Sequence, residues 1–373
     1  MKRYFKILVI TFLSITGILL TGLLVLAFNS PGKLDPLLNT EGKNIEGSLS
    51  ERNFTETGGV KQGFFIRSEN PENPVILFLH GGPGSPELAI LYPFETTERL
   101  EKYFTVCYWD QRGAGMSYNK SVNTTSMTVD QLIEDTHHMT ELLKKRFNKD
   151  KIYLMGHSWG TYLGIKTIEK YPENYIAFIG IGQVSNQLES ERIAYNYMVS
   201  HAKETDDKSA LKKLKKFDVN ATDFPSLKYL LSVRSLLMNK YKIGIMHDDE
   251  FSVAGLIKNL LSFRGYTISE KLFFFKGSMF SLTNLWHYVE EDNLMESSTK
   301  FRVPVYIIHG KYDYQVSHTL SKKYFEKIEA PSKAFYTFEN SAHSPNSEEP
   351  EKFVGTVLEI ASKNINIPND SIN

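Results

Sequence analysis

Short apolar runs separated by helical patterns are the feature that most narrows the folds open to this chain. Seven runs are expected to form strands, at residues 63–67, 75–79, 105–109, 152–155, 176–181, 303–308 and 333–338. Helical patterns lie between several of them, most clearly at residues 129–147 and 162–171. Continuous apolar strands that alternate with helices favour a largely parallel sheet covered on both faces. The sequence therefore predicts an α/β fold.

The alternation stops between residues 183 and 299, where strand signals vanish and helical patterns dominate. Because the strand rhythm resumes afterwards, we interpret residues 183–299 as a helical cap inserted into one α/β core, residues 46–182 and 300–373. The lysines of "KSALKKLKK", residues 208–216, are interpreted as the solvated face of a cap helix. Contact with anionic lipid is the alternative.

The N-terminus carries a long uncharged segment from Ile7 to Phe28, preceded by Lys2, Arg3 and Lys6. As a helix it would span about 33 Å, which matches a bilayer core. We expect residues 1–28 to be a membrane anchor followed by a tether at 29–45, with a cleaved signal sequence or a buried helix as alternatives. Because positive charges stay cytoplasmic, the remaining chain is expected to be extracytoplasmic, or secreted if the segment is cleaved.

Charge and cysteine content exclude two further classes. Lys plus Arg and Asp plus Glu both total 43, so no bulk charge attracts nucleic acid. Cys107 is the only cysteine, which rules out an intramolecular disulfide, and its apolar surroundings favour a packing role over a reactive one. The expected partners are therefore a small substrate and, through the N-terminal helix, a membrane.

The pentapeptide "GHSWG", residues 156–160, stands where an expected strand gives way to an expected helix. This context gives the common G-x-S-x-G pattern its meaning, because a serine on such a strained turn is exposed at the edge of the sheet. Side chains at the flanking positions would clash with the strand and the helix. Ser158 is therefore the expected nucleophile of an acyl transfer.

A serine hydroxyl needs a base, and the base needs a carboxylate to orient it. Among ten histidines, His343 in "ENSAHSP" follows the last expected strand, which is where the order serine, acid, histidine places the base. Asp313 follows the preceding strand and is the expected acid. Glu339 and Asp292 are its rivals.

Donors for the developing oxyanion are expected at two backbone positions. One is the N–H of Trp159, directly after the nucleophile. The other lies in "HGGPG", residues 80–84, where glycines let the backbone approach a substrate; Gly82 is preferred, with Gly81 second. This loop lacks the Lys-Ser/Thr of a nucleotide-binding loop, and no metal cluster is evident, so neither metal nor cofactor is expected.

Five motifs together resemble the proline iminopeptidase-like branch of the α/β-hydrolase superfamily, over roughly residues 50–363. They are "HGGPG" at 80–84, "DQRGAGMS" at 110–117, "GHSWG" at 156–160, "HGKYD" at 309–313 and "AHSP" at 342–345. The resemblance implies a serine aminopeptidase that removes an N-terminal residue, often proline, from short peptides. It also implies that Asp110 and Arg112 are structural.

Such an exopeptidase needs cap carboxylates to pair with the substrate ammonium, and Glu290 and Glu291 are the candidates. His157 stands where those peptidases usually have glycine. A carboxylesterase or lipase-like hydrolase of small or lipid-like esters is the main alternative. A non-catalytic binding domain on a hydrolase scaffold is the minor one.

Overall fold

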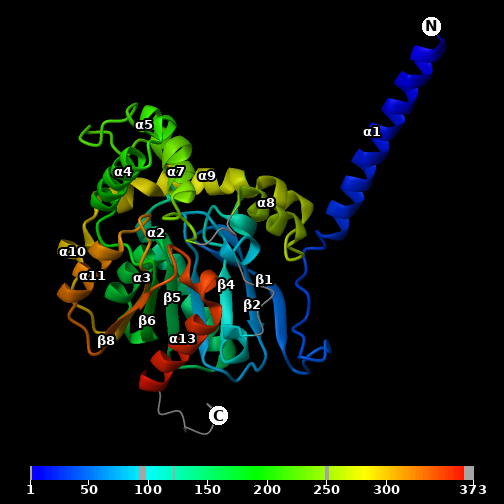
Figure 1. Ribbon diagram of the computed structural model, residues 1–373. Coiled ribbons are helices and arrows are strands. Elements are labelled where there is room, and N and C mark those ends of the chain that lie inside the picture. The colour runs from blue at the N-terminus through cyan, green and yellow to red at the C-terminus, as the bar shows by residue number, and fades with distance from the viewer. Residues whose placement is uncertain (1, 92–97, 121, 248–251, 365–373) are drawn as a thin grey trace.

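The computed structural model describes residues 2–91, 98–120, 122–247 and 252–364, and its centre is one sheet (Figure 1). Eight strands among these residues form it in the order β1-β2-β4-β3-β5-β6-β7-β8. They are β1 (Leu49–Thr57), β2 (Val60–Ser68), β3 (Val75–Leu79), β4 (Thr105–Trp109), β5 (Ile152–His157), β6 (Tyr175–Ile181), β7 (Val305–Gly310) and β8 (Lys333–Phe338).

Neighbouring strands from β4 through β3 to β8 are parallel, while β2 runs antiparallel to both β1 and β4. This arrangement confirms the expected α/β class with a mostly parallel sheet. Strand β1 was not expected, because its sequence, "LSERNFTET", is polar. It is a half-buried edge strand whose register is set by pairing with β2 along its whole length.

Both faces of the sheet are buried. In β3, Val75, Leu77 and Leu79 belong to one apolar cluster, and the alternate residues Ile76 and Phe78 belong to another. The first cluster is closed by α2 (Val129–Phe147), α3 (Trp159–Lys170) and α11 (His318–Lys327), and the second mainly by α13 (Pro350–Asn364). Continuous apolar strands are thus explained by helices on both sides. Cys107 of β4 is fully buried, and burial raises the pKa of its thiol, as a packing role requires.

Between β6 and β7 the chain forms a group of helices, hereafter the cap, over the carboxyl end of the sheet (Figure 1). The cap comprises α4 (Gln187–Glu204), α5 (Lys208–Leu214), α6 (Leu227–Tyr229), the π-helical η6 (Leu230–Arg234), α7 (Ser235–Lys240), α8 (Val253–Ser262), α9 (Ile268–Glu291) and α10 (Leu294–Ser297). Part of the cap has its own apolar cluster, which includes Met198, Tyr229 and Met238.

Single-turn helices connect the larger elements: η1 (Glu87–Ala89), η2 (Leu100–Lys102), η3 (Gly115–Ser117), η4 (Thr124–Ser126), η5 (Pro172–Asn174) and α12 (Pro345–Glu348).

Helix α1 (Lys2–Phe28) projects away from the rest of the chain (Figure 1). Its residues Tyr4–Phe28 are long and apolar enough to cross a membrane, and none of the apolar window is buried against the protein. In this structure the helix therefore does not pack in the apolar core. A signal sequence near the N-terminus would meet the same criteria of length and composition.

Candidate active site

Ser158 lies on a tight turn between β5 and α3. Its φ of 55° and ψ of −121° are a conformation that residues with side chains rarely adopt. A Cβ on Gly156 would lie 2.3 Å from the carbonyl oxygen of Gly160, and one on Gly160 would lie 2.0 Å from that of Leu79. The two glycines therefore let α3 pack directly against β5 and β3, and the turn presents Ser158 at the edge of the sheet.

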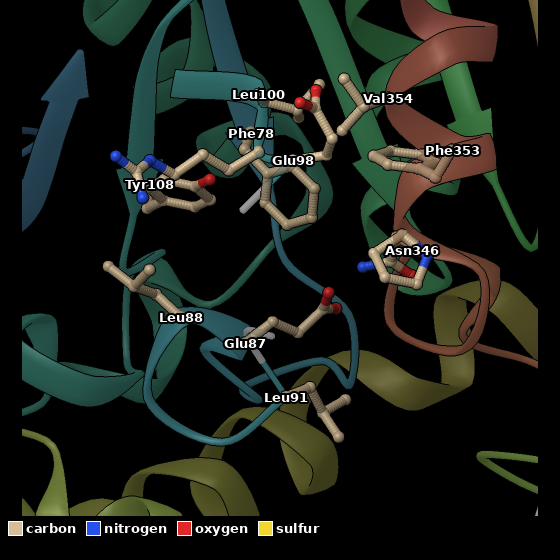
Figure 2. Close-up of a pocket in the computed structure, with 12 residues that line it drawn as sticks. Phe78, Glu87, Leu88, Leu91, Glu98, Leu100, Tyr108, Asn346, Phe353 and Val354 are labelled. Atoms are coloured by element: carbon tan, nitrogen blue, oxygen red, sulfur yellow. The ribbon is translucent and has the colours of Figure 1, made fainter. Parts of the chain in front are cut away.

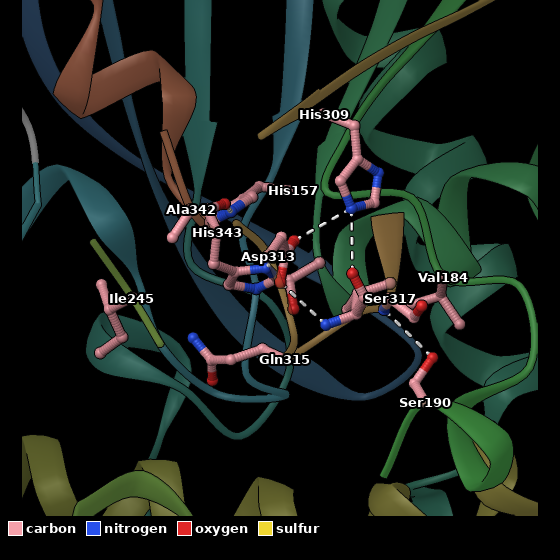
Figure 3. Close-up of polar contacts among 12 residues, drawn as sticks. His157, Val184, Ser190, Ile245, His309, Asp313, Gln315, Ser317, Ala342 and His343 are labelled. Carbon is pink, nitrogen blue, oxygen red and sulfur yellow. Dashed lines mark hydrogen bonds and ion pairs between the residues drawn. The ribbon is translucent and has the colours of Figure 1, made fainter. Parts of the chain in front are cut away.

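Asp313 and His343 follow β7 and β8, which are parallel to β5, so all three side chains belong to one edge of the sheet. His343 Nδ1 is 2.8 Å from Asp313 Oδ2, and His309 Nε2 is 3.1 Å from the same oxygen. Figure 3 shows Asp313 between these two rings. The backbone N–H of Val316 donates to Asp313 Oδ1 at 3.0 Å, which fixes the carboxylate.

Ser158 and His343 both lie against the end of β6. The Ser158 N–H donates to the Ile181 carbonyl at 2.9 Å, and a Cβ on Gly182 would lie 3.1 Å from His343 Nδ1. Within the described part of the chain, no direct hydrogen bond joins Ser158 to His343. Such contacts are often long before a substrate binds and shorten in the complex.

The protonation states of Asp313 and His343 depend on their burial and on the interaction between the two side chains. Burial by itself raises the pKa of Asp313, but His343 and hydrogen bonds from His309 and His343 outweigh it and hold the pKa well below its ordinary value. Burial lowers the pKa of His343, and His157 and His309 add to this effect against the attraction of Asp313. At neutral pH Asp313 is therefore ionised and His343 is a neutral base.

The two rival acids lie elsewhere. Glu339 is exposed and pairs with Lys311 at 2.6 Å. Asp292 pairs with Lys166 of α3 at 2.7 Å and hydrogen-bonds Ser297. Their pairings leave Asp313 as the carboxylate that contacts His343.

The glycine-rich loop after β3 lies beside the serine, since a Cβ on Gly81 would be 3.1 Å from Ser158 Cβ. The Gly81 N–H donates to Glu87 Oε1 at 2.9 Å and is therefore occupied. Gly82 and Trp159 line a cavity together with Ser158. Trp159 is also the first residue of α3, where backbone N–H groups have no acceptor within the helix. Gly82 and Trp159 are thus better placed than Gly81 to serve an oxyanion.

His157 and Glu87 form a buried pair that sequence reasoning did not find. His157 Nδ1 is 2.5 Å from Glu87 Oε1, and its Nε2 is 2.7 Å from the backbone carbonyl oxygen of His343. Because both ring nitrogens face acceptors, both must carry protons, so the ring is an imidazolium. Burial opposes charge on each partner, but the attraction between them raises the pKa of His157 and lowers that of Glu87. The only signal in the sequence was one glutamate within the apolar stretch "PELAIL".

Glu87 also borders a second cavity of about 50 Å³, lined mainly by apolar side chains such as Phe78, Leu88 and Phe353 (Figure 2). Glu87 Oε2 and Asn346 Oδ1 have no hydrogen-bond partner among the described residues. A space of this size can hold a water molecule, for which roughly 10–15 Å³ suffices. The cavity therefore has room for a donor to both oxygens.

The cavity at Ser158 is roofed by the cap and measures about 50 Å³. Its lining includes Gln187, Arg234 and Trp286 from the cap and Gln315 from the loop after β7. Arg234 is buried and held by Glu191, with an Nη2–Oε1 distance of 2.6 Å. Ligand pockets usually enclose roughly 300–1,000 Å³. The cap side chains must therefore shift before a peptide or ester can enter.

The two expected cap carboxylates do not line this cavity. Glu290 is half-buried and accepts a hydrogen bond at 2.5 Å from the indole N–H of Trp286, which does line it. Burial, with Glu191 and Glu291 nearby, raises the pKa of Glu290 to about 7. Glu291 is exposed. The charged side chain that lines the cavity is Arg234, which the sequence analysis did not single out.

The "DQRG" loop after β4 is held in place by buried polar contacts of Asp110 and Arg112. Asp110 Oδ2 accepts from the Met116 N–H and from the Tyr266 hydroxyl, each at 2.8 Å. Arg112 Nε donates to Asp135 at 2.7 Å in a fully buried ion pair.

Gln111, between them, contacts both His80 and Trp159. Its amide donates to the His80 carbonyl at 3.0 Å and accepts from the Trp159 indole at 2.9 Å. Its side chain therefore ties the glycine-rich loop to the turn that carries Ser158.

One stretch of the cap, the 243–247 segment, contacts the loops that carry Asp313 and His343. The Ile243 carbonyl accepts from the Tyr314 N–H at 3.2 Å, and the Gly244 carbonyl accepts from the His343 N–H at 3.3 Å. The ring of His247 stacks on that of Tyr312 with centroids 3.6 Å apart. This segment thus attaches the cap to the loops after β7 and β8.

No group of three or more His, Cys, Asp or Glu side chains is arranged to hold a metal ion within residues 2–91, 98–120, 122–247 and 252–364.

Comparison with known proteins places this geometry in context. A family profile described as alpha/beta hydrolase fold matches residues 74–350. The chain is 35% identical to a protein named probable aminopeptidase YbaC from Bacillus subtilis (strain 168), over 80% of this chain and 92% of that one. It is 23% identical to a proline iminopeptidase from Heyndrickxia coagulans, over 82% and 96% of the two chains.

Among solved structures, the proline iminopeptidase of Mycobacterium smegmatis superposes with a TM-score of 0.61 at 13% identity, covering 84% of this chain and 98% of that one. At this identity the superposition shows a shared fold and no more. The sequence matches and the fold together confirm the resemblance found in the five motifs.

Proposed function

Because the chain belongs to the α/β-hydrolase family, we propose that it is a serine hydrolase that works through an acyl-enzyme. One observation carries the proposal. Ser158, on its strained turn, shares a cavity with Gly82 and Trp159, while His343, bonded to Asp313, lies against the same strand end. A nucleophile, a base, an orienting acid and two backbone donors are the parts that acyl transfer needs.

In the acylation step, Ser158 Oγ attacks the substrate carbonyl carbon while His343 Nε2 takes the hydroxyl proton. Asp313 keeps the proton of His343 on Nδ1 and stabilises the imidazolium that forms. The N–H groups of Gly82 and Trp159 donate to the oxyanion. The bond to the leaving group then breaks, and His343 returns the proton to the departing nitrogen or oxygen.

Deacylation repeats these steps with water. His343 takes a proton from the water, the resulting hydroxide attacks the acyl carbon, and Ser158 leaves with that proton restored. The low pKa of His343 favours both steps at neutral pH, because the ring begins each of them as a free base.

The substrate class is proposed to be short peptides with a free amino terminus, of which one N-terminal residue, proline or similar, is released. The printed names of the relatives, aminopeptidase and proline iminopeptidase, support this assignment. Glu290 is the preferred partner of the substrate ammonium because it contacts Trp286 at the cavity wall, and Glu291 is its exposed neighbour.

An esterase is the second candidate, and Arg234 favours it. The charge that lines the cavity beside Ser158 is a cation, although Glu191 pairs with it. A nearby cation does not favour an ammonium group, whereas an uncharged ester is indifferent to it.

Attachment to a membrane through α1 is part of the proposal. The length and composition of Tyr4–Phe28 support a spanning helix, and the positive residues before it support an extracytoplasmic catalytic domain. Cleavage after export would instead release a secreted enzyme.

A fluorophosphonate probe tests the nucleophile. The full chain in detergent is expected to be labelled, and Ser158→Ala is expected to lose the label while keeping its melting temperature. Failure to label the wild-type chain would favour a binding domain on a hydrolase scaffold. Hydrolysis of prolyl-naphthylamide and of p-nitrophenyl esters then separates the two substrate classes, since cleavage of esters alone excludes the aminopeptidase.

A further inference from the structure

Exposed apolar side chains are concentrated on one part of the cap. Outside α1, thirteen large apolar side chains of the described residues are exposed, and eleven of them lie within residues 227–279. The other two are Leu38 and Phe54. Scattered exposed apolar residues are ordinary, but a contiguous group marks a surface that contacts something apolar.

These side chains follow helical spacing and therefore form stripes. On α8 the exposed positions are Val253, Ile257 and Leu261, four residues apart. On α9 they include Ile268, Leu272, Phe275 and Met279, spaced by four, three and four. The residues of α9 that are buried, such as Phe274 and Gly277, lie between these positions in the sequence and face the protein. Each helix thus has a second apolar face that is exposed. These two exposed faces of α8 and α9 are hereafter called the apolar stripes.

The apolar stripes lie beside the end of α1. A cavity is lined jointly by Val25 and Leu26 of α1 and by Ile257 and Leu261 of α8. Figure 1 shows α8 next to the base of α1, and α9 continuing from it on the same side of the sheet.

Hydrogen bonds fix this junction. The Arg264 guanidinium donates to the Phe28 carbonyl at 2.9 Å, and the buried Lys271 ammonium donates to the Asn29 carbonyl at 2.6 Å. A backbone bond from Lys33 N–H to the Arg264 carbonyl, at 3.1 Å, extends the attachment. The end of α1 is therefore held directly beside α8 and the beginning of α9.

We propose that the apolar stripes of α8 and α9 rest in the interfacial layer of the bilayer that α1 crosses. The proposal depends on the membrane attachment proposed above. A helix that lies in this layer buries its apolar face roughly 5–10 Å below the headgroups, which suits stripes one side chain deep.

The charges nearby agree with a lipid surface as the occupant. Along α8, and along α9 as far as Met279, the only carboxylate is Glu270, and Arg52 pairs with it. Lys258 and Lys276 are exposed among the apolar positions. Lysines that flank an apolar face place their ammonium groups at lipid phosphates.

Site-specific fluorescence in the full chain tests the proposal. Leu272→Cys and Val253→Cys, with side chains 70% and 65% exposed in the parent, receive an environment-sensitive dye after reconstitution in phosphatidylcholine vesicles. Cys107 is fully buried and does not compete for the dye. Ser362→Cys, on the exposed face of α13, is the matched control.

Dyes on both stripe positions are expected to emit at shorter wavelength than the control and to lose fluorescence to lipids that carry a nitroxide near the headgroup. The control is expected to lose fluorescence only to aqueous iodide. Stripe dyes that behave like the control would overturn the proposal. Stripe dyes shielded from iodide but unaffected by nitroxide lipids would overturn it too, because a protein surface would then cover the stripes.

Alkaline carbonate extraction separates this inference from the membrane attachment on which it rests. Retention of the chain in the vesicles, with stripe dyes exposed to iodide, rejects the docked stripes and leaves the anchor standing. Release of the chain by carbonate rejects the anchor, and the docked stripes with it.

Discussion

At the scale of single residues, two neighbouring histidines differ in charge: His157 is positive and His343 is neutral. The rings of His157 and His343 are 4.8 Å apart. His157 presents both nitrogens to acceptors and is an imidazolium, whereas His343 presents only Nδ1 to Asp313 and is a neutral base. The positive ring disfavours a second positive ring beside it, so His157 helps to keep His343 unprotonated.

The double variant Glu87→Gln/His157→Gln removes both charges of the buried pair together. Without the imidazolium, the pKa of His343 is expected to rise, so the acid limb of kcat/KM moves to higher pH. Unit charges about 5 Å apart interact by a few kcal/mol at an effective dielectric of about 20, and Glu87 offsets part of this, so we expect a shift of about one pH unit.

The groups that face the two rings are Glu87, His80, Asp313 and His309. His80 has a pKa lowered to about 4 by burial and stays neutral over the range of interest. The measurement is kcat/KM from pH 4 to 9 with an uncharged ester, so that the substrate does not titrate. His138→Gln on α2, far from Ser158, is the control, and an unmoved acid limb in the double variant contradicts the argument.

Glu290 leads to a second pH prediction. Its pKa is raised to about 7, so its carboxylate is ionised only above that pH. KM for a peptide with a free amino terminus is expected to fall as pH rises through about 7, until the substrate amine loses its proton near pH 8. KM for an ester is expected to stay level. Glu290→Gln abolishes the fall and Glu291→Gln preserves it; equal profiles for all three enzymes would remove Glu290 from substrate recognition.

Candidate site residues that directly follow a strand could be predicted from the sequence. Site residues that are defined by contacts with distant parts of the chain could not. The positions of Ser158, Asp313 and His343 were inferred because each follows an apolar run, and parallel strands bring such positions to one edge. Arg234 carries no local signal and Glu87 only its place in an apolar stretch, since their partners are 43 and 70 residues away. Whether the triad acts as proposed remains for the probe experiment.

At the scale of elements, the site depends on how closely α3 approaches β3. A Cβ on Gly160 would lie 2.0 Å from the Leu79 carbonyl oxygen. This oxygen belongs to the backbone of β3, so it cannot move aside without disturbing the strand. The first turn of α3 also carries the Trp159 N–H. Any displacement of the helix therefore moves the proposed oxyanion donor and Ser158 together.

Gly160→Ala is expected to destabilise the protein by roughly 1–3 kcal/mol or more and to abolish hydrolysis, because the helix must move. Gly355→Ala in α13, where an added Cβ meets nothing within 4 Å, is the matched control. It is expected to stabilise the protein by about 0.5–1 kcal/mol, the helical preference of alanine over glycine. Urea denaturation in detergent measures both; equal midpoints for Gly160→Ala and the parent would refute the close contact.

Among the elements, the apolar strands and the helices α2 and α3 were predicted as separate elements, whereas the polar strand β1 and the individual cap helices were not. Helix α2 coincides with the expected range, 129–147. Strand β1 was not predicted, because an edge strand with a solvated face need not be apolar. The packing of the cap helices on one another was beyond pattern reasoning, because helices shorter than three turns, such as α5, α6 and α7, are specified by their neighbours.

At the scale of the whole molecule, α1 projects from the side on which the cap covers the sheet, and α8 of the cap lies next to the base of α1 (Figure 1). The cap is therefore the part of the catalytic domain nearest to any membrane that holds α1. The opposite end of the molecule, with α13, points away from it.

This arrangement predicts the accessibility of two labels in intact cells. A membrane-impermeant maleimide is expected to label Ser362→Cys without lysis, because the proposed orientation places the catalytic domain outside the cytoplasm. A cysteine inserted after Met1 is expected to react only after lysis. The reverse pattern would place the catalytic domain in the cytoplasm, and loss of the N-terminal thiol from the mature chain would reveal cleavage.

The hydrogen bonds of the 243–247 segment connect the cap with the two loops that follow β7 and β8. Gly244 holds the backbone of the base, and Ile243 that of the residue after the acid. Any displacement of this segment therefore also pulls on the backbone of the loops that carry Asp313 and His343. The position of the cap and the positions of these two residues are thus coupled.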